Sequence, residues 1–392
     1  MKKTVMLLSL AGAGFPLVAA ADVTMYGFIS AAVESVKTSG ATNGGNSGSA
    51  MRVTDQTSRI GFKGTEDLGD GRSAIWQVES AVKFTGGGTG LNGTTSTLAS
   101  RNSFVGLADR SYGTLQMGYY ESAYRRFTTM NVGTDLMVNT TAGTDVALNY
   151  QGVVNRGDAR LKNSVHYTTP TWNGFQAGVS WGADENAANY GKTGSQQRLS
   201  FGGQYSDGGF IVAAGYDRQN NLAANLSTAV SSSQPLAEQF SAMANTNISF
   251  SKLAAGYKTS FGTYFGAAFE HGELGRHTAS SSTMTQNDYT LAVSQAVGRA
   301  TFMLSYNRLG SLENAYAGAP DDWSATQWVV GSTYALSKTT TLLAYWTRLN
   351  NSKYQNQTLI QNVYDSGAYT TSGVLLPGST VSAIGAGLRI SF

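Results

Sequence analysis

The last twelve residues of the chain constrain its fold more than any other segment. Counting back in twos from the C-terminus gives only apolar residues, whereas serine, arginine and glycine lie between them; the apolar set is Phe392, Ile390, Leu388, Ala386 and Ile384. Because side chains alternate between the two faces of a strand, this period of two predicts a strand with one apolar face. A strand that runs to the final residue and ends in an aromatic ring predicts a barrel that closes on its last strand at a membrane interface. In lipid no water is present to satisfy an open sheet edge.

The composition supports a membrane barrel. Charged residues are 13% of the chain, about half the usual fraction of a soluble protein. After residue 21 no stretch approaches the eighteen consecutive apolar residues that a spanning helix needs. Cysteine is absent and the three histidines have no ligand spacing, so we expect no disulfide, no metal site and no cofactor. The net charge of +3 gives no reason to expect nucleic-acid binding.

The N-terminus indicates export. Lys2 and Lys3 precede an apolar run, 5–18, which is followed by Ala19-Ala20-Ala21. This pattern is typical of a secretory signal peptide, and we predict cleavage after Ala21. Residues 22–392 would then form the barrel domain.

Short alternating strands recur along the whole remaining chain, and we count sixteen of them. Their connections alternate between short turns and long loops rich in glycine, serine, threonine and asparagine; the turns lie near 68–71, 109–112, 170–174, 206–209, 259–262, 296–299 and 336–339. Short connections on one side and long ones on the other are typical of outer-membrane barrels, with turns in the periplasm and loops outside. The predicted fold class is therefore an all-β, sixteen-stranded antiparallel transmembrane barrel, a size that leaves an aqueous channel.

Alternation also predicts which charged side chains point into the lumen. On the second strand Ile60 and Phe62 face outward, so Arg59 and Lys63 face inward. The same reasoning gives further lumen residues, which are Arg160, Lys162, Arg198 and Arg389. For Arg101 the alternation is ambiguous.

The connection from about 120 to 158 is far longer than a hairpin needs. It mixes charged residues with apolar ones such as Phe127 and Met137. The apolar residues favour packing against a wall, so we predict that this loop folds into the lumen and narrows it. The alternative is an exposed surface loop.

Several motifs, in order, resemble the general porins of neisseriae and other beta-proteobacteria. They include Asp22-Val23-Thr24-Met25-Tyr26-Gly27, the run 59–69 beginning Arg-Ile-Gly-Phe-Lys-Gly, the run 163–170 and the final Phe392. The resemblance covers the whole chain after the signal peptide. It implies a homotrimer in the outer membrane, in contact with lipid and lipopolysaccharide, and a C-terminal Phe392 that serves as a signal for the barrel-assembly machinery.

The resemblance also implies a site. The third loop would form a constriction, and the wall arginines that face it would be Arg59, Arg101 and Arg160. Loop carboxylates Glu121, Asp135 and Asp145 could supply the opposing side of a transverse field. Field lines concentrate where a low-dielectric wall narrows, so we expect passive flux of ions and small hydrophilic solutes with a mild preference for anions. The chain departs from the family pattern at Arg125-Arg126 and over 139–153, which leaves the eyelet's size and charge balance open.

Other readings of the sequence carry less weight. The run 88–93 fits G-x-G-x-x-G but no amphipathic helix follows it. His166 is interpreted as a wall residue, and Glu34 and Glu79 as solvated lumen groups rather than a catalytic pair. Competing hypotheses are a barrel enzyme, which would need a convergent nucleophile and base, and an adhesin or receptor barrel without an open pore. A substrate-selective channel is a variant of the passive-diffusion hypothesis. We expect no enzymatic activity.

Overall fold

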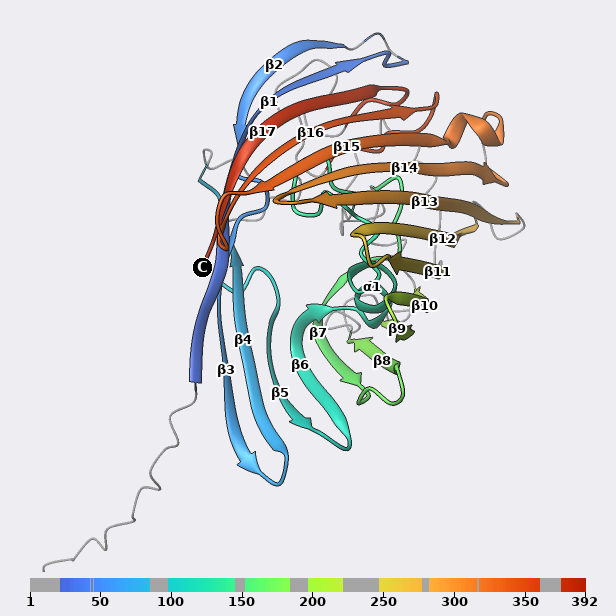
Figure 1. Ribbon diagram of the computed structural model, residues 1–392. Helices are drawn as coiled ribbons and strands as arrows, with labels where there is room; N and C mark the ends of the chain where they lie inside the picture. The colour runs from blue at the N-terminus through green and yellow to red at the C-terminus, as the bar shows by residue number, and fades with distance from the viewer. Residues whose placement is uncertain are drawn as a thin grey trace, which may run out of the picture.

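The computed structural model describes residues 22–42, 44, 46–84, 98–144, 152–183, 197–220, 247–276, 282–315, 317–359 and 375–392. The predicted signal peptide lies outside these residues. Almost all the regular structure is antiparallel sheet (Figure 1). No helix in the described part of the chain is long and apolar enough to cross a membrane.

The strands follow one another around the sheet in chain order. They are β1 (Asp22–Ser39), β2 (Ser47–Thr54), β3 (Arg59–Gly69), β4 (Arg72–Ala81), β5 (Ser103–Asp109), β6 (Gly113–Glu121), β7 (Arg160–Thr168), β8 (Phe175–Gly182), β9 (Arg198–Asp207), β10 (Phe210–Gln219), β11 (Ile248–Lys258), β12 (Thr263–Arg276), β13 (Thr283–Val297), β14 (Ala300–Glu313), β15 (Ala325–Ala335), β16 (Thr340–Asn351) and β17 (Thr380–Ser391). From β3 to β17 each strand pairs antiparallel with the next one in sequence.

The sheet closes on itself through its first and last strands. β17 pairs with β16 on one side and with β1 on the other. The pairing continues to the last residue, because the backbone N–H groups of Gly27 and Phe392 each donate to the other's carbonyl at 3.1 Å. The predicted barrel closure on the final strand is confirmed.

One strand of the barrel is interrupted. β1 pairs with β3 through its first half and with β2 through its second half, so β2 and β3 occupy one position in the wall. Within the described residues the seventeen segments therefore make sixteen strands, as predicted. The sequence analysis took the strand at Ile60 and Phe62 as the second and so missed β2, which begins with serine and glycine and has only Met51 and Val53 as outward apolar residues. The break at 55–58 contains Gln56 and Thr57 at φ +43° and +55°.

Turns and loops separate cleanly between the two ends of the barrel. The seven short turns predicted from sequence all join consecutive strands, beginning with the turn between β3 and β4 and ending with that between β15 and β16. The connection between β6 and β7, residues 122–159 and here called L3, turns into the barrel. Its helix α1 (Ala123–Arg125) lies inside the ring of strands, beside β8, β9 and β10 (Figure 1). A one-turn π-helix, η1 (Arg126–Met130), continues it.

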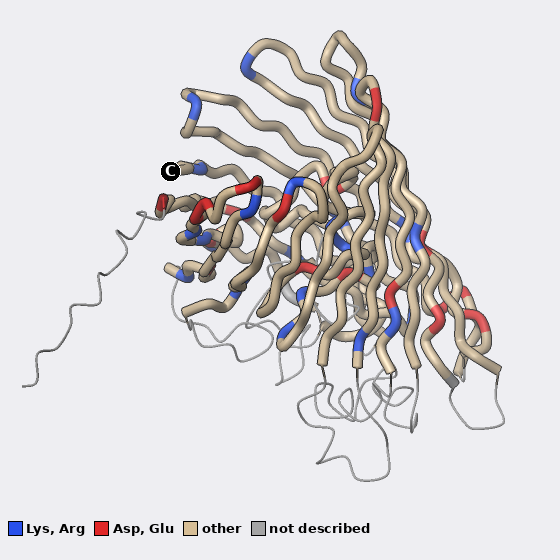
Figure 2. Tube along the Cα trace, turned by 90° about the horizontal axis from the view of Figure 1, so that it is seen from below, with Lys and Arg blue, Asp and Glu red and all other residues tan. Residues whose placement is uncertain are grey.

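The outer face is apolar and poor in charge. Outward residues of the last twelve positions are exposed as predicted, with Ile384 of β17 at 60% and the terminal Phe392 at 45%. Charged residues are sparse along the strands (Figure 2). Lipid can solvate such a band, whereas an arginine at its midplane would cost roughly 2–4 kcal/mol.

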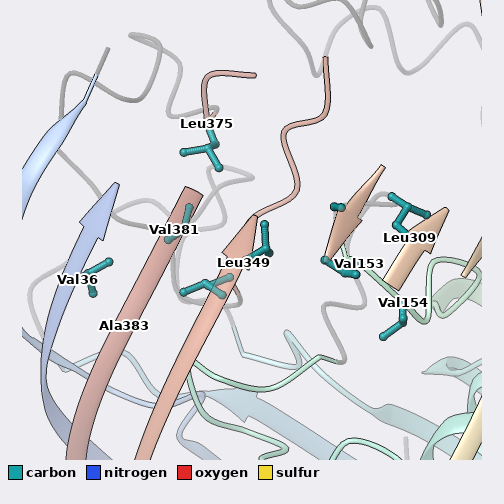
Figure 3. Packing of buried hydrophobic residues seen from close by; sticks show 10 residues of the cluster. Val36, Val153, Val154, Leu309, Leu349, Leu375, Val381 and Ala383 are labelled. Carbon is teal, nitrogen blue, oxygen red and sulfur yellow. The ribbon is translucent and has the colours of Figure 1, made fainter. Parts of the chain in front are cut away.

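The lumen is not uniformly polar, which corrects a sequence-based expectation. Towards the loop end of β14–β17 and β1, inward-facing side chains are apolar and fully buried, among them Val36, Leu309 and Leu349. They belong to one buried cluster with Val153 and Val154 of L3 (Figure 3). Alternation alone predicted water on this face. The apolar residues are explained by the returning arm of L3, which covers them and excludes water.

Candidate constriction of the channel

L3 is attached to the wall from its first turn. The backbone N–H groups of Ala123 and Tyr124 donate to the hydroxyl oxygens of Ser180 and Ser200, each at 2.9 Å. These serines are inward-facing residues of β8 and β9 and are fully buried. Free N–H groups at a helix start need acceptors, and here the barrel wall supplies them. The inward fold of the third loop is therefore confirmed.

A single carboxylate then holds both arms of L3. Glu270, on β12 and fully buried, accepts a 2.5 Å hydrogen bond from the Tyr124 hydroxyl at the start of the loop. It also accepts from the backbone N–H groups of Arg156 at 2.7 Å and Gly157 at 3.3 Å, near the end of the loop. Burial and the Glu270 charge raise the pKa of Tyr124 well above its usual value, so this hydroxyl keeps its proton.

The tip of L3 crosses to the opposite wall. Val132 accepts a hydrogen bond from the Tyr264 hydroxyl of β12 at 2.5 Å, and further on Thr141 donates its N–H to Gln56 at 2.9 Å. Asn139 meets two arginines: Arg59 of β3 bonds to its side-chain oxygen, and Arg389 of β17 donates to its carbonyl at 3.1 Å. L3 thus spans the lumen between the β8–β12 wall and the β17–β1–β3 wall.

The three predicted wall arginines are brought together on the side of β3–β7. Arg101, just before β5, lies 2.5 Å from Glu79, and Arg59 lies 3.9 Å from the same carboxylate. Arg160 binds its cross-strand partner Glu121 at 2.5 Å and also reaches the side-chain oxygen of Asn102 at 2.7 Å. Arg59 interacts electrostatically with Arg101, Arg160 and Arg389, and Arg101 interacts with Arg160. We call Arg59, Arg101, Arg160 and Arg389, with Glu79 and Glu121, the arginine cluster.

Within the described residues, the predicted loop carboxylates do not form an acidic side that faces the wall arginines across the pore. Glu121 is the last residue of β6 and belongs to the same wall as the arginines; it also binds Arg125 at 2.8 Å. Asp135 lies in L3 and is 8% exposed. Asp145 lies outside the described residues. Glu121 therefore neutralises arginines at contact distance rather than facing them across the pore.

The remaining predicted lumen residues are spread along the wall. The Nζ atoms of Lys63 and Lys162 lie 5.4 Å and 5.8 Å from the ring centres of Tyr26 and Tyr119. Arg198 is bound to Asp217 at 2.7 Å and donates to the Gly157 carbonyl of L3 at 2.8 Å. His166 is hydrogen-bonded between Ser164 and Ser180, each at 2.7 Å.

Sequence reasoning missed the residues that fix the loop. Glu270 and Asn139 carried no motif. Glu79 was recognised as facing the lumen, but its pairing with two arginines depends on which strands are neighbours. Alternation on β12 would have placed Glu270 inward, since Phe265 and Phe269 of the same strand point outward. That signal identifies a lumen residue without saying what it binds.

Two adjacent glycines on β9 allow a direct test of how tightly L3 is packed. A Cβ atom at Gly202 would lie 2.5 Å from the Ala123 carbonyl oxygen of α1, whereas one at Gly203 would make only ordinary contacts. We expect Gly202→Val to push α1 into the lumen, at a cost of about 1–3 kcal/mol, and to lower single-channel conductance. Gly203→Val, on the lipid face, is the matched control. Equal conductance in both variants would contradict this packing.

A closed sixteen-stranded barrel with an apolar exterior, a charged lumen and a loop across that lumen defines an outer-membrane diffusion channel. The family model described as "Gram-negative porin" matches residues 7–354. This chain belongs to the Gram-negative porin family.

Relatives and solved structures agree with this assignment. The chain is 29% identical over 365 residues to the major outer membrane protein P.IB of Neisseria meningitidis, covering 91% of this chain and 96% of that protein. It is 27% identical to P.IB of Neisseria lactamica over 346 residues, covering 88% and 92%. Among solved structures, an anion-selective porin from Comamonas acidovorans superposes with a TM-score of 0.71 at 22% identity, covering 95% of this chain and all of that one. OmpT of Vibrio cholerae, in a trimer form, has a TM-score of 0.61 at 14% identity, covering 95% of this chain and 100% of that chain.

Proposed function

We propose that this porin lets small hydrophilic solutes and ions diffuse passively across the outer membrane, with a preference for anions. No covalent chemistry is involved, and the concentration gradient alone drives the flux. The arginine cluster would act as the selectivity site, by raising the local concentration of anions at the narrowest section.

The charge balance of the arginine cluster carries this proposal. Four guanidinium groups face two carboxylates there, so the cluster keeps an excess of positive charge. The side chains are largely buried by the wall and by L3, with Arg59 at 17% and Arg160 at 12% side-chain exposure. Low dielectric and little water strengthen the field of these charges compared with bulk solution. The Comamonas porin described as anion-selective is consistent with this charge sign.

The reversal potential of single channels in a salt gradient tests the proposal. We expect the refolded protein in a planar bilayer to conduct and to give an anion-directed potential in potassium chloride. A cation-directed potential would overturn the charge assignment and leave the channel in place. Folded barrels without conductance would favour a receptor barrel instead, and saturable flux of one solute would indicate a substrate-selective channel.

We further propose that the protein assembles as a homotrimer, and that the barrel-assembly machinery recognises the C-terminal Phe392. The trimer form of the Vibrio cholerae OmpT structure supports this oligomeric state. Conductance should then appear in steps of three, and unheated protein should migrate on a gel at about three times the mass of heated protein.

A further inference from the structure

Arg125 and Arg126 are consecutive in L3 but have opposite surroundings. The Nη1 atom of Arg125 lies 2.8 Å from Glu121, and its Nε atom lies 3.9 Å from Asp158. Arg126 turns towards β7 instead, where its Nη1 donates to the Thr168 hydroxyl oxygen at 2.7 Å. The charge of Arg125 is therefore balanced by carboxylates at contact distance, whereas the partner of Arg126 is a neutral hydroxyl.

The surroundings of Arg126 offset its charge only in part, because Glu121 acts on it from beyond contact distance. Its guanidinium carbon lies 5.4 Å and 5.6 Å from the ring centres of Tyr120 and Phe127. Its Nη2 atom packs near the bare backbone of Gly178. In the part of the chain that the structure describes, no carboxylate lies within 4.0 Å of it, and its buried Nε and Nη2 atoms have no acceptor. Burial lowers the pKa of Arg126, but an arginine stays charged at neutral pH.

The position of this charge extends the positive lining of the lumen. Arg160, in the arginine cluster, is the first residue of β7, and Thr168 is the last, next to the short turn that follows. At about 3.3 Å per residue these two positions are roughly 26 Å apart along the strand. Lys162, also without a carboxylate within 4.0 Å in the described residues, lies on the same strand close to the cluster. Arg126 therefore carries positive charge from the constriction towards the turn end of the barrel.

We propose that Arg126 is a second selectivity-determining residue of the channel, which draws small anions such as carboxylates and phosphate from the arginine cluster towards the periplasmic exit. The inference rests on the proposed anion-preferring function. It assigns a positive charge to L3, whereas the sequence analysis expected carboxylates on the loop side of the pore. Aromatic rings and bare backbone on its sides keep the local dielectric low, which increases the reach of the charge into the water-filled path.

Neutralising Arg126 tests the inference. We expect Arg126→Gln to lower the anion-to-cation permeability ratio about two- to threefold in 0.1 M potassium chloride, which is the effect of one charge acting over several ångströms. In 1 M salt the Debye length falls to about 3 Å, so the difference from the wild type should vanish. Arg126→Lys keeps the charge and should retain the wild-type ratio.

Thr168→Val separates charge from loop position. It removes the hydrogen-bond acceptor of Arg126, keeps side-chain shape, and should leave the permeability ratio unchanged. The inference is overturned if R126Q has the wild-type ratio in 0.1 M salt, or if T168V lowers the ratio as much as R126Q does. If the wild type has no anion preference, the proposed function is overturned. If the permeability ratio of R126Q is nevertheless lower than that of this wild type, the role of Arg126 is still supported.

Discussion

Replacing Arg59, Arg101 and Arg160 together by glutamine should reverse the selectivity of the channel. The substitution removes three of the four positive charges of the cluster, leaving Arg389 beside Glu79 and Glu121, of which Glu121 stays paired with Arg125 of L3. With each charge contributing roughly a two- to threefold factor, the anion-to-cation permeability ratio should fall about tenfold. The reversal potential in a potassium chloride gradient should therefore change sign and become cation-directed.

The corresponding lysine variant is the control for this experiment. Replacing the same three residues by lysine keeps the charge but loses the two-point contact that Arg160 makes with Glu121 through Nε and Nη2. The sign of the potential should then be preserved. If the glutamine protein does not fold, because Glu79 loses both of its arginine partners and Glu121 keeps only Arg125, the single variant Arg101→Gln gives a smaller shift of the same direction. An anion-directed potential unchanged in R101Q would argue against the cluster as the selectivity site.

The barrel could be predicted from sequence because its signal is local and repeated. Inward and outward residues alternate on nearly every strand, so face assignments such as Ile60 out and Arg59 in need no knowledge of neighbours. The sequence-based prediction is wrong where a loop covers the inner face of a strand and replaces water there. Val36 and Leu349 point into the lumen yet belong to the same buried cluster as Val153 of L3, and no pattern within β1 or β16 reveals that cluster.

The candidate site was predictable in its arginines but not in its charge balance. Alternation places Arg59 and Arg160 inside the barrel, and the resemblance to the porin family adds Arg101. The partners of these residues depend on strand register: Glu121 sits opposite Arg160 only because β6 and β7 pair in that register. The sequence analysis assigned Glu121 to the loop, whereas in the structure it ends β6 and forms an ion pair with Arg160 of the wall.

Replacing Glu270 by alanine should release L3 from the wall. Glu270 is the shared acceptor for Tyr124 at one end of the loop and for Arg156 and Gly157 at the other, so both arms lose an anchor at once. Lys252, 3.8 Å away and 4% exposed, would also lose a counter-charge. Removing one partner of a buried ion pair typically costs about 3–5 kcal/mol. The loss here should destabilise the loop rather than the sheet, because the backbone pairing of β12 does not involve this side chain.

Single-channel recording and proteolysis measure this release. With L3 no longer held across the lumen, we expect the E270A protein to show a larger and noisier conductance and faster cleavage within 122–159, while the barrel stays folded. Glu273→Ala is the matched control: Glu273 lies on the same strand and accepts a hydrogen bond from Ser249 at 2.9 Å, away from L3. The two variants separate local anchoring from any general effect of removing a carboxylate from β12. If E270A has wild-type conductance and resists protease as the control does, the remaining contacts of L3 at Ser180, Ser200, Tyr264 and Gln56 suffice to hold it, and the role assigned to Glu270 is wrong.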